Sequence, residues 1–171
     1  MERALSVASE ILRYNQTEVR RSIHNLRSKT LEQFDLPTAF AVACKHAQHA
    51  SEVDFRVSTT GEPRRYRATV ENGLLRICQE AVTNAVKHAR ATHISVEFAF
   101  EAEKLLLAIK DDGIGFDPKA LSLQGDGHFG ILGMKERADR LGAELLIESS
   151  ASGTKLAVLF RAEELLHMKD D

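Results

Sequence analysis

The sequence has only two cysteines, no long apolar run and no excess of charge of one sign. Cys44 and Cys78 both lie in segments with a helical pattern, which predicts buried, reduced thiols and a reducing, cytoplasmic compartment instead of a disulfide framework. No apolar run approaches the ~20 residues that span a bilayer. The N-terminus lacks the pattern of a signal peptide. We therefore expect no membrane segment here, although a longer parent protein anchored in the inner membrane would be compatible.

The charges nearly cancel, with 23 basic and 25 acidic residues and a net charge of -2. Such a chain has no global field that would attract nucleic acid or an anionic membrane, so an anionic ligand must be held by local groups. A chain of 171 residues, 43% of them hydrophobic, can also bury a core without the help of a disulfide or a metal. These properties predict one globular domain, with room for an appendage.

The first 34 residues contain neither glycine nor proline, which favours a helix. Apolar or small residues recur there at alternating spacings of three and four, as in a narrow heptad seam. A lone helix with such a seam has nothing to bury it against, so a partner helix must come from a second chain or from sequence outside this one. Leu36-Pro37 then breaks the helix, and a second amphipathic helix is expected from Thr38. The seam is formed by Leu5, Ala8, Leu12, Asn15 and Val19.

The remaining sequence alternates between strand and helix patterns. The second of two consecutive strands within 93–113 is nearly all apolar and is expected at the centre of a sheet. A glycine-bearing loop over 113–129 separates this pair of strands from the later elements. The predicted elements are a strand at 53–58, a helix at 70–90, the two strands within 93–113, a helix at 131–141 and strands at 143–150 and 155–160.

Four polar residues stand out on the helix predicted at 70–90. Glu80, Asn84, Lys87 and His88 fall within an arc of about 100° beside an apolar stripe. Carboxylate and carboxamide oxygens suit Mg²⁺, and a lysine can meet phosphate oxygens as a point charge. A solvated helix face gives the same spacing, so the chemistry requires an anionic or metal-bearing ligand. The stripe itself consists of Leu74, Ile77, Cys78, Ala81, Val82, Ala85 and Ala89.

Three glycine-bearing segments add further candidates. Asp111 ends the apolar strand, where a carboxylate can accept a hydrogen bond from an exocyclic amine such as that of adenine; Gly113 and Gly115 would let the backbone approach a flat ligand. A common Asp-Gly turn explains the same residues. The segment 130–133 opens a helix whose free N–H groups suit phosphate, or is simply a glycine cap. Thr154 heads the last strand, where its hydroxyl reaches phosphate or serves the turn.

The order and spacing of these segments are more specific than any one of them. Together they closely resemble the nucleotide-binding boxes of the GHKL ATPase superfamily and, within it, the catalytic ATP-binding domain of sensor histidine kinases of the nitrate-sensor and DesK type. The resemblance covers about residues 36 to 161. It implies the Bergerat fold: an α+β, two-layer α/β sandwich with a mixed sheet, here preceded by an N-terminal helix. The matching motifs are Glu80-x-x-x-Asn84-x-x-Lys87-His88, Asp111-x-Gly113-x-Gly115-Phe116, the stretch from Gly127 to Arg137, and Gly153-Thr154.

The resemblance also implies a role for each matching residue. Glu80, Asn84 and Lys87 would be catalytic, with Asn84 and Glu80 at a Mg²⁺ ion. Asp111 would bind the adenine amine, the two glycines after it would leave room for the base, and the loop from about Ser122 to Phe129 would be a lid. ATP would be bound by Asn84, Lys87, His88, Asp111, Gly113, Gly115, Phe116, Gly127, His128, Gly130, Ile131, Gly133 and Thr154.

The implied reaction is transfer of the ATP γ-phosphoryl group to a histidine, followed by relay to an aspartate on a response regulator receiver domain. Residues 1–35 resemble the second helix of the family's dimerisation hairpin, and the family has no acceptor at the position of His24. We therefore expect three parts: 1–35 as half of a truncated hairpin, 36–161 as the catalytic domain and 162–171 as a tail. The acceptor histidine would lie outside this chain, which alone would not autophosphorylate.

The full-length protein would then form a homodimer through the hairpin, with ATP or ADP as ligand and no nucleic acid. Two other functions are compatible with the motifs: a nucleotide-binding regulatory or dimerisation module without kinase activity, and another GHKL ATPase such as an anti-sigma serine kinase. The intact motifs argue against the first. The short lid and the N-terminal heptad helix favour the histidine kinase over the second.

Overall fold

The computed structural model describes residues 28–49, 53–117 and 129–161. The predicted heptad seam, His24, Gly127 and His128 lie outside these residues, as does the tail at 162–171. Within the described part of the chain, no helix combines the length and the apolar character needed to cross a membrane. Most of the described residues therefore belong to the predicted catalytic domain at 36–161.

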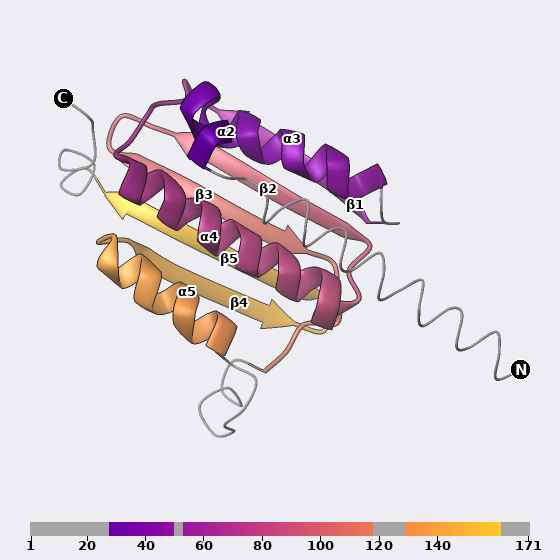
Figure 1. Cartoon of the computed structure of the whole chain (residues 1–171). Helices are drawn as coiled ribbons and strands as arrows, with labels where there is room; N and C mark the ends of the chain where they lie inside the picture. The colour runs from indigo at the N-terminus through magenta and orange to yellow at the C-terminus, as the bar shows by residue number, and fades with distance from the viewer. Residues whose placement is uncertain (1–27, 50–52, 118–128, 162–171) are drawn as a thin grey trace, which may run out of the picture.

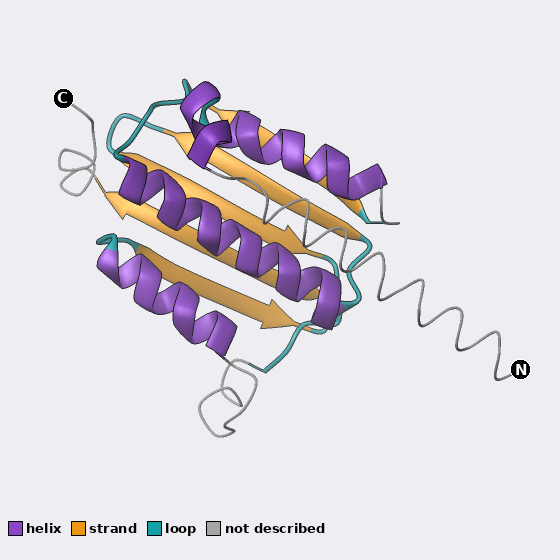
Figure 2. Cartoon of the chain, viewed as in Figure 1, coloured by secondary structure: helices purple, strands orange, loops and turns teal. Residues whose placement is uncertain are grey.

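A five-stranded sheet forms one layer, and the helices α3, α4 and α5 cover one of its faces (Figures 1 and 2). The strand order is β1-β2-β3-β5-β4. Only β1 and β2 are parallel; the other neighbours are antiparallel. The predicted α+β, two-layer sandwich with a mixed sheet is thus confirmed, with β3 at its centre. The strands are β1 (Asp54–Thr60), β2 (His93–Phe100), β3 (Lys104–Asp111), β4 (Glu144–Ser150) and β5 (Gly153–Arg161).

The core lies between the sheet and the helices. Strand β3 alternates, so that Leu105, Leu107 and Ile109 are buried under the helices and Asp111 ends the strand on the same face. Each fully buried leucine or isoleucine stabilises the fold by roughly 1.5–3 kcal/mol. This alternation carries a carboxylate into the covered layer at the end of the central strand.

Both cysteines belong to this core. Cys44 and Cys78 are free and buried, as predicted. Burial raises the pKa of Cys44 to about 12 and holds the pKa of Cys78 well above its usual value. Because the thiolate is the reactive form, these cysteines are packing residues with little nucleophilic character.

The first helices depart from the predicted boundaries. Helix α2 (Ser28–Gln33) ends before Asp35, and α3 (Leu36–His49) begins earlier than the predicted Thr38. The Thr38 N–H donates to Asp35 Oδ1 at 2.8 Å, so Asp35 caps α3 and Pro37 lies in the first turn, where its missing N–H costs nothing. Leu31 of α2 is buried in the core, which joins α2 to the domain that follows it.

The helix predicted at 70–90 divides into two parts. Helix α4 (Ala68–Asn84) continues directly into a π-helical turn, η1 (Ala85–Ala89), which ends at Arg90 in the left-handed conformation with φ 55°. A π turn inserts an extra residue per turn and therefore rotates Lys87 and His88 away from their regular helical positions. Every member of the predicted apolar stripe is buried except Ala81, which is partly buried against the core.

Candidate nucleotide-binding site

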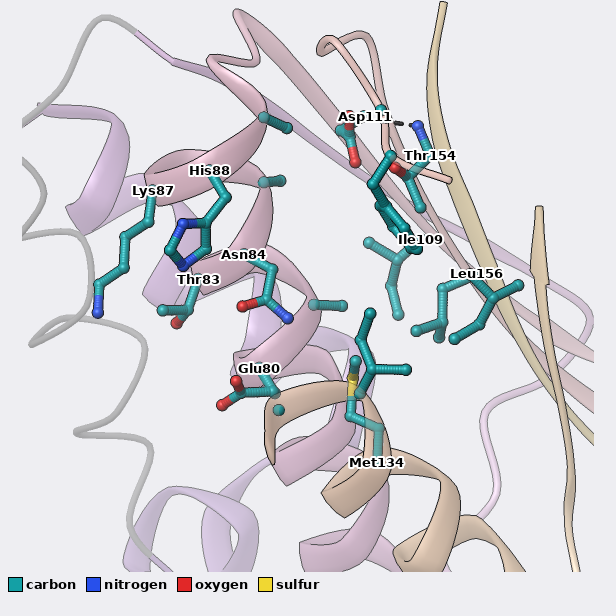
Figure 3. Close-up of a pocket in the computed structure, with 18 residues that line it drawn as sticks. Glu80, Thr83, Asn84, Lys87, His88, Ile109, Asp111, Met134, Thr154 and Leu156 are labelled. Carbon is teal, nitrogen blue, oxygen red and sulfur yellow. Dashed lines mark hydrogen bonds between the residues drawn. The ribbon is translucent and has the colours of Figure 1, made fainter. Parts of the chain in front are cut away.

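A cavity of about 420 Å³ lies between the C-terminal half of α4 with η1, the start of α5 (Phe129–Arg140) and the ends of the central strands (Figure 3). A cavity of this size is typical of sites for small molecules. One part of its wall is formed by apolar side chains from the sheet and α5, and the other by polar side chains from α4 and η1, together with two from the ends of β3 and β5. The apolar part includes Ile109, Ile131, Met134, Ile147 and Leu156; the polar part includes Glu80, Thr83, Asn84, Lys87, His88, Asp111 and Thr154.

The four polar residues predicted on the helix all line this cavity. Figure 3 shows Glu80, Asn84, Lys87 and His88 along one edge of α4 and η1, with Asp111 across the cavity. Within the described parts of the chain, none of the four side chains has a hydrogen-bond or ion-pair partner. An edge with a carboxylate, a carboxamide, an ammonium and an imidazole, none of them paired, is equipped to bind a polar ligand.

Asp111 is held by the backbone around it. It is 8% exposed, and its Oδ1 accepts the N–H of Gly113 at 2.9 Å and of Thr154 at 3.3 Å. No donor among residues 28–49, 53–117 and 129–161 reaches its Oδ2. One carboxylate oxygen therefore fixes the side chain, and the other is available to an N–H donor of a ligand.

The glycines after Asp111 are required by contacts within the chain. A Cβ on Gly113 would lie 2.4 Å from the carbonyl oxygen of Ala89, and Gly113 is not on the cavity wall. Gly115 does line the cavity, but it has φ +61°, and a Cβ there would lie 1.9 Å from the carbonyl oxygen of Ser150. Close backbone approach therefore accounts for both glycines, where room for a flat base was the expected reason.

Ser149 is a residue of the site region that the sequence motifs did not identify. Its Oγ accepts the N–H of Phe116 at 2.9 Å and lies 3.0 Å from Thr154 Oγ1. The hydroxyl thus links the loop after Asp111 to Thr154. Ser149 and Thr154 are paired across the β4–β5 hairpin, whose two-residue turn is Ala151-Ser152, and this register places the two hydroxyls opposite each other.

The start of α5 closes the cavity on the side of Glu80. A Cβ on Gly130 would lie 2.3 Å from Glu80 Oε1 and 3.4 Å from Asn84 Nδ2. Gly130 and Ile131 line the cavity; Gly133 does not, and a Cβ there would meet nothing within 4 Å. Gly130 thus lies beside Glu80 and Asn84 on the polar edge of α4, whereas Gly133 is not part of the cavity wall.

A second aspartate fixes the backbone that follows Asp111. Asp112 accepts the N–H of His93 at 2.9 Å and of Thr92 at 2.8 Å, and His93 Nδ1 lies 2.8 Å from its Oδ2. The hydrogen bond from the His93 backbone, followed by that from the Thr92 hydroxyl, holds the pKa of Asp112 well below its usual range. This exposed clasp ties the end of β3 to the start of β2.

The fold and the cavity define a two-layer α/β domain whose ligand site lies between helices and sheet at the end of the central strand. Residues 69–164 match the model of the family described as histidine kinase-, DNA gyrase B- and HSP90-like ATPase. The match covers more than half of the chain and includes the elements that carry the cavity. The chain therefore belongs to this ATPase family, as the resemblance implied.

The relatives within the family are sensor histidine kinases. The chain is 35% identical over 152 residues to the signal transduction histidine-protein kinase/phosphatase DegS of Brevibacillus brevis, covering 87% of this chain and 38% of DegS. It is 34% identical over 145 residues to the kinase/phosphatase UhpB of Salmonella typhimurium, covering 82% of this chain and 27% of UhpB. The chain thus spans well under half the length of these curated relatives.

A solved structure supports the fold. The histidine kinase domain of the blue-light activated histidine kinase from Erythrobacter litoralis EL346 matches with a TM-score of 0.59 at 17% sequence identity, over 77% of this chain and 63% of that chain. At this identity the likeness concerns the fold alone. The relatives, which are named as histidine kinases, favour a histidine kinase domain over another GHKL ATPase such as an anti-sigma serine kinase.

Proposed function

We propose that the chain is the catalytic domain of a sensor histidine kinase, which binds Mg-ATP and transfers the γ-phosphoryl group to a histidine side chain for relay to a response regulator aspartate. The observation that carries the proposal is the edge of Glu80, Asn84, Lys87 and His88, unpaired among the described residues and facing Asp111 across one cavity. The edge offers groups for phosphates and a metal; Asp111 offers an acceptor for a base.

The residues present fit a Mg²⁺ ion that is shared with the nucleotide. Glu80 and Asn84 supply hard oxygen donors, and within the described residues no group of three or more His, Cys, Asp or Glu side chains forms a complete metal site. Mg²⁺ is usually bound by one or two protein oxygens together with phosphates and waters. Glu80 and Asn84 would hold the ion, which would supply positive charge beside the phosphates.

The remaining groups position the nucleotide. Lys87 is an exposed cation at the rim, placed to meet phosphate oxygens, and Asp111 is held so that its Oδ2 accepts the amine of adenine. The first N–H groups of α5, beside Gly130, lack partners within the helix and suit a phosphate. Phosphoryl transfer depends mainly on such positioning and on charge neutralisation, and the nucleophilic histidine would come from another helix.

The organisation of the whole protein forms part of the same proposal. Residues 1–35 would belong to a dimerisation hairpin, 36–161 to the catalytic domain and 162–171 to a tail. The parent protein would dimerise through the hairpin, meet a receiver domain and keep this domain in the cytoplasm. The burial of Leu31 supports a direct mechanical connection between the helix of the first part and the core of the second.

Nucleotide binding is tested by calorimetry and thermal unfolding with Mg-ADP. The wild-type chain should bind, and a ligand at ~1,000 times its dissociation constant should stabilise it by about 4 kcal/mol. The Asn84→Ala variant should lose the magnesium-dependent part of the affinity. Asn72→Ala is a matched control, because Asn72 lies on the same helix, is exposed and donates to the carbonyl of Ala68. Unchanged Mg-ADP affinity in Asn84→Ala would refute the assigned role.

Catalysis is tested by adding a separately produced acceptor hairpin and labelled ATP. Phosphohistidine should form on the hairpin when the wild-type chain is present, and should be absent with Asn84→Ala. Nucleotide binding without phosphohistidine would favour a regulatory nucleotide-binding module instead.

A further inference from the structure

The hydroxyl of Ser149 contacts several residues of the cavity wall from behind. Its Oγ accepts the N–H of Phe116 at 2.9 Å and lies 3.0 Å from Thr154 Oγ1. It also lies against Gly115, where an added Cβ would be 2.9 Å from the oxygen. Gly115, Phe116 and Thr154 all line the cavity, whereas Ser149 is not among the described residues that do so. One hydroxyl outside the wall therefore joins three residues of the wall.

The place of Ser149 follows from the register of the β4–β5 hairpin. Ser149 pairs with Thr154, and Ile147 pairs with Leu156 two residues further along each strand. Side chains two residues apart in a strand share a face of the sheet. Because Ile147 and Leu156 line the cavity, the side chains of Ser149 and Thr154 lie on the same, covered face. The hydroxyl pair thus follows an apolar pair at the end of the hairpin.

The part of the wall that Ser149 contacts is the part that holds Asp111. The Thr154 N–H donates to Asp111 Oδ1 at 3.3 Å, and Figure 3 shows these two residues side by side. Glu80 and Lys87 belong to the other edge of the cavity, on α4 and η1. Ser149 is therefore connected to the part of the site that is proposed to hold the base, and not to the edge that is proposed to hold the phosphates.

We infer that Ser149 is a positioning residue for base recognition, whose hydroxyl holds the wall beside Asp111 so that this carboxylate distinguishes an amine from a carbonyl on a purine. The inference rests on the proposed function, because it needs a purine nucleotide in this cavity. An amine donates to a carboxylate oxygen, whereas a carbonyl in the same place would bring two acceptors together. The distinction depends on where the base lies relative to Asp111. A hydroxyl suits this place because it can accept one hydrogen bond and donate another.

The test is Ser149→Ala, which removes both hydrogen bonds and adds no atom to the wall. The affinity for Mg-ADP should fall about tenfold, because two hydrogen bonds that position the base side are lost. The affinity for Mg-IDP, the inosine nucleotide with a carbonyl in place of the amine, should fall by no more than about twofold, because its binding does not use the amine. Competition with a fluorescent ADP analogue measures both affinities, on protein shown to be folded by its thermal unfolding.

Two further variants separate the hydroxyl from its surroundings. Ser149→Thr keeps the hydroxyl on a residue that favours strands and should retain the preference for Mg-ADP over Mg-IDP within about threefold. Ser150→Ala makes the same change at the next residue, which is exposed and whose Oγ lies 2.9 Å from Ser152 Oγ, and should leave both affinities unchanged. The Phe116 amide proton should exchange with solvent about tenfold faster in Ser149→Ala, because it loses its acceptor.

Four results would overturn the inference. The first is equal affinity of the wild-type chain for Mg-ADP and Mg-IDP, and the second is an unchanged preference in Ser149→Ala. The third is an equal loss of both affinities, which would indicate a general loosening of the fold, and the fourth is an equal loss of preference in Ser149→Thr. A wild-type chain that bound no nucleotide would contradict the proposed function, and the inference with it. Nucleotide binding with a preference that was indifferent to Ser149→Ala would remove the inference alone.

Discussion

Each end of helix α4 carries a glutamate, and the two glutamates differ in their surroundings. Glu71, in the first turn, is 2% exposed and accepts hydrogen bonds from Arg65 Nε at 2.8 Å, from Arg65 Nη2 at 3.0 Å and from the Tyr66 N–H at 3.1 Å. Glu80, in the second half of the helix, lines the cavity with no partner among the described residues. The oxygens of the buried Glu71 are satisfied within the protein, as a structural carboxylate requires, whereas the oxygens of Glu80 are left available to a ligand.

The Glu71 end also joins separate parts of the chain. Arg65 donates to the carbonyl of Leu31 in α2 while it pairs with Glu71. The carboxylate therefore fixes an arginine that holds α2 against the domain. The cavity end has the opposite character, because its π turn and unpaired side chains favour a ligand over internal contacts.

The largest expected effect is a loss of stability when the Glu71 end of α4 is disrupted. Glu71→Ala should lower the free energy of unfolding by about 3 kcal/mol, because it leaves the Tyr66 N–H and Arg65 without their partner. Chemical denaturation measures this loss. Glu80→Ala is the matched control and should change the free energy of unfolding by less than about 0.5 kcal/mol in the absence of nucleotide. Equal losses in the two variants would remove the distinction between the ends.

The next effect concerns the cavity end. Gly130→Ala places a methyl group against Glu80 Oε1, the mobile end of a side chain, so the fold should tolerate it while Glu80 is displaced. Mg-ATP affinity should fall about tenfold, measured by calorimetry. Wild-type affinity in this variant would show that the position of Glu80 is unimportant for binding.

Gly133→Ala sharpens the same comparison within α5. A Cβ at this helical position meets nothing within 4 Å, so the variant should raise the free energy of unfolding by about 0.5–1 kcal/mol through the higher helix propensity of alanine. Thermal unfolding without nucleotide checks it. A destabilised variant would contradict the open surroundings of this glycine.

The smallest effect is expected at the exposed clasp of Asp112. Its pKa lies below the ordinary aspartate value in the folded state, so its stabilising contribution is fully present above about pH 4, diminishes below that value and is lost as the pH falls through the folded pKa. Asp112→Asn should therefore lower the unfolding temperature at pH 7 by no more than about 2 °C. The difference from the wild type should shrink on acidification below pH ~4; a constant difference down to pH ~2 would exclude this linkage.

Much of the fold followed from sequence pattern, because the responsible signals are local. The nearly all-apolar sequence of β3 predicted its place at the centre of the sheet, and the apolar stripe of α4 predicted the buried face of that helix. Two boundaries did not follow. The cap of α3 by Asp35 depends on a side-chain orientation, and the π turn depends on packing around Ala85–Ala89, so neither has a periodic signature.

The candidate site was predictable where a motif fixes the spacing and less so where contacts are long-range. Glu80, Asn84 and Asp111 share one cavity as expected. The hydrogen bond between Ser149 and Phe116, and the close approach of Gly113 to Ala89, depend on segments that are brought together only by the fold. The spacing of residues along the chain does not reveal such contacts. The Arg65–Glu71 pair was missed for a related reason, since its purpose is to hold α2.

The most direct test of the account is a map of backbone amide chemical shifts along α4 and η1 during titration with Mg-ADP. Large changes are predicted from Glu80 to Ala89 and around Asp111, with the amides of 65–73 nearly unchanged. Changes concentrated at 65–73, or no changes in a folded protein at millimolar Mg-ADP, would contradict a nucleotide site at the C-terminal end of this helix.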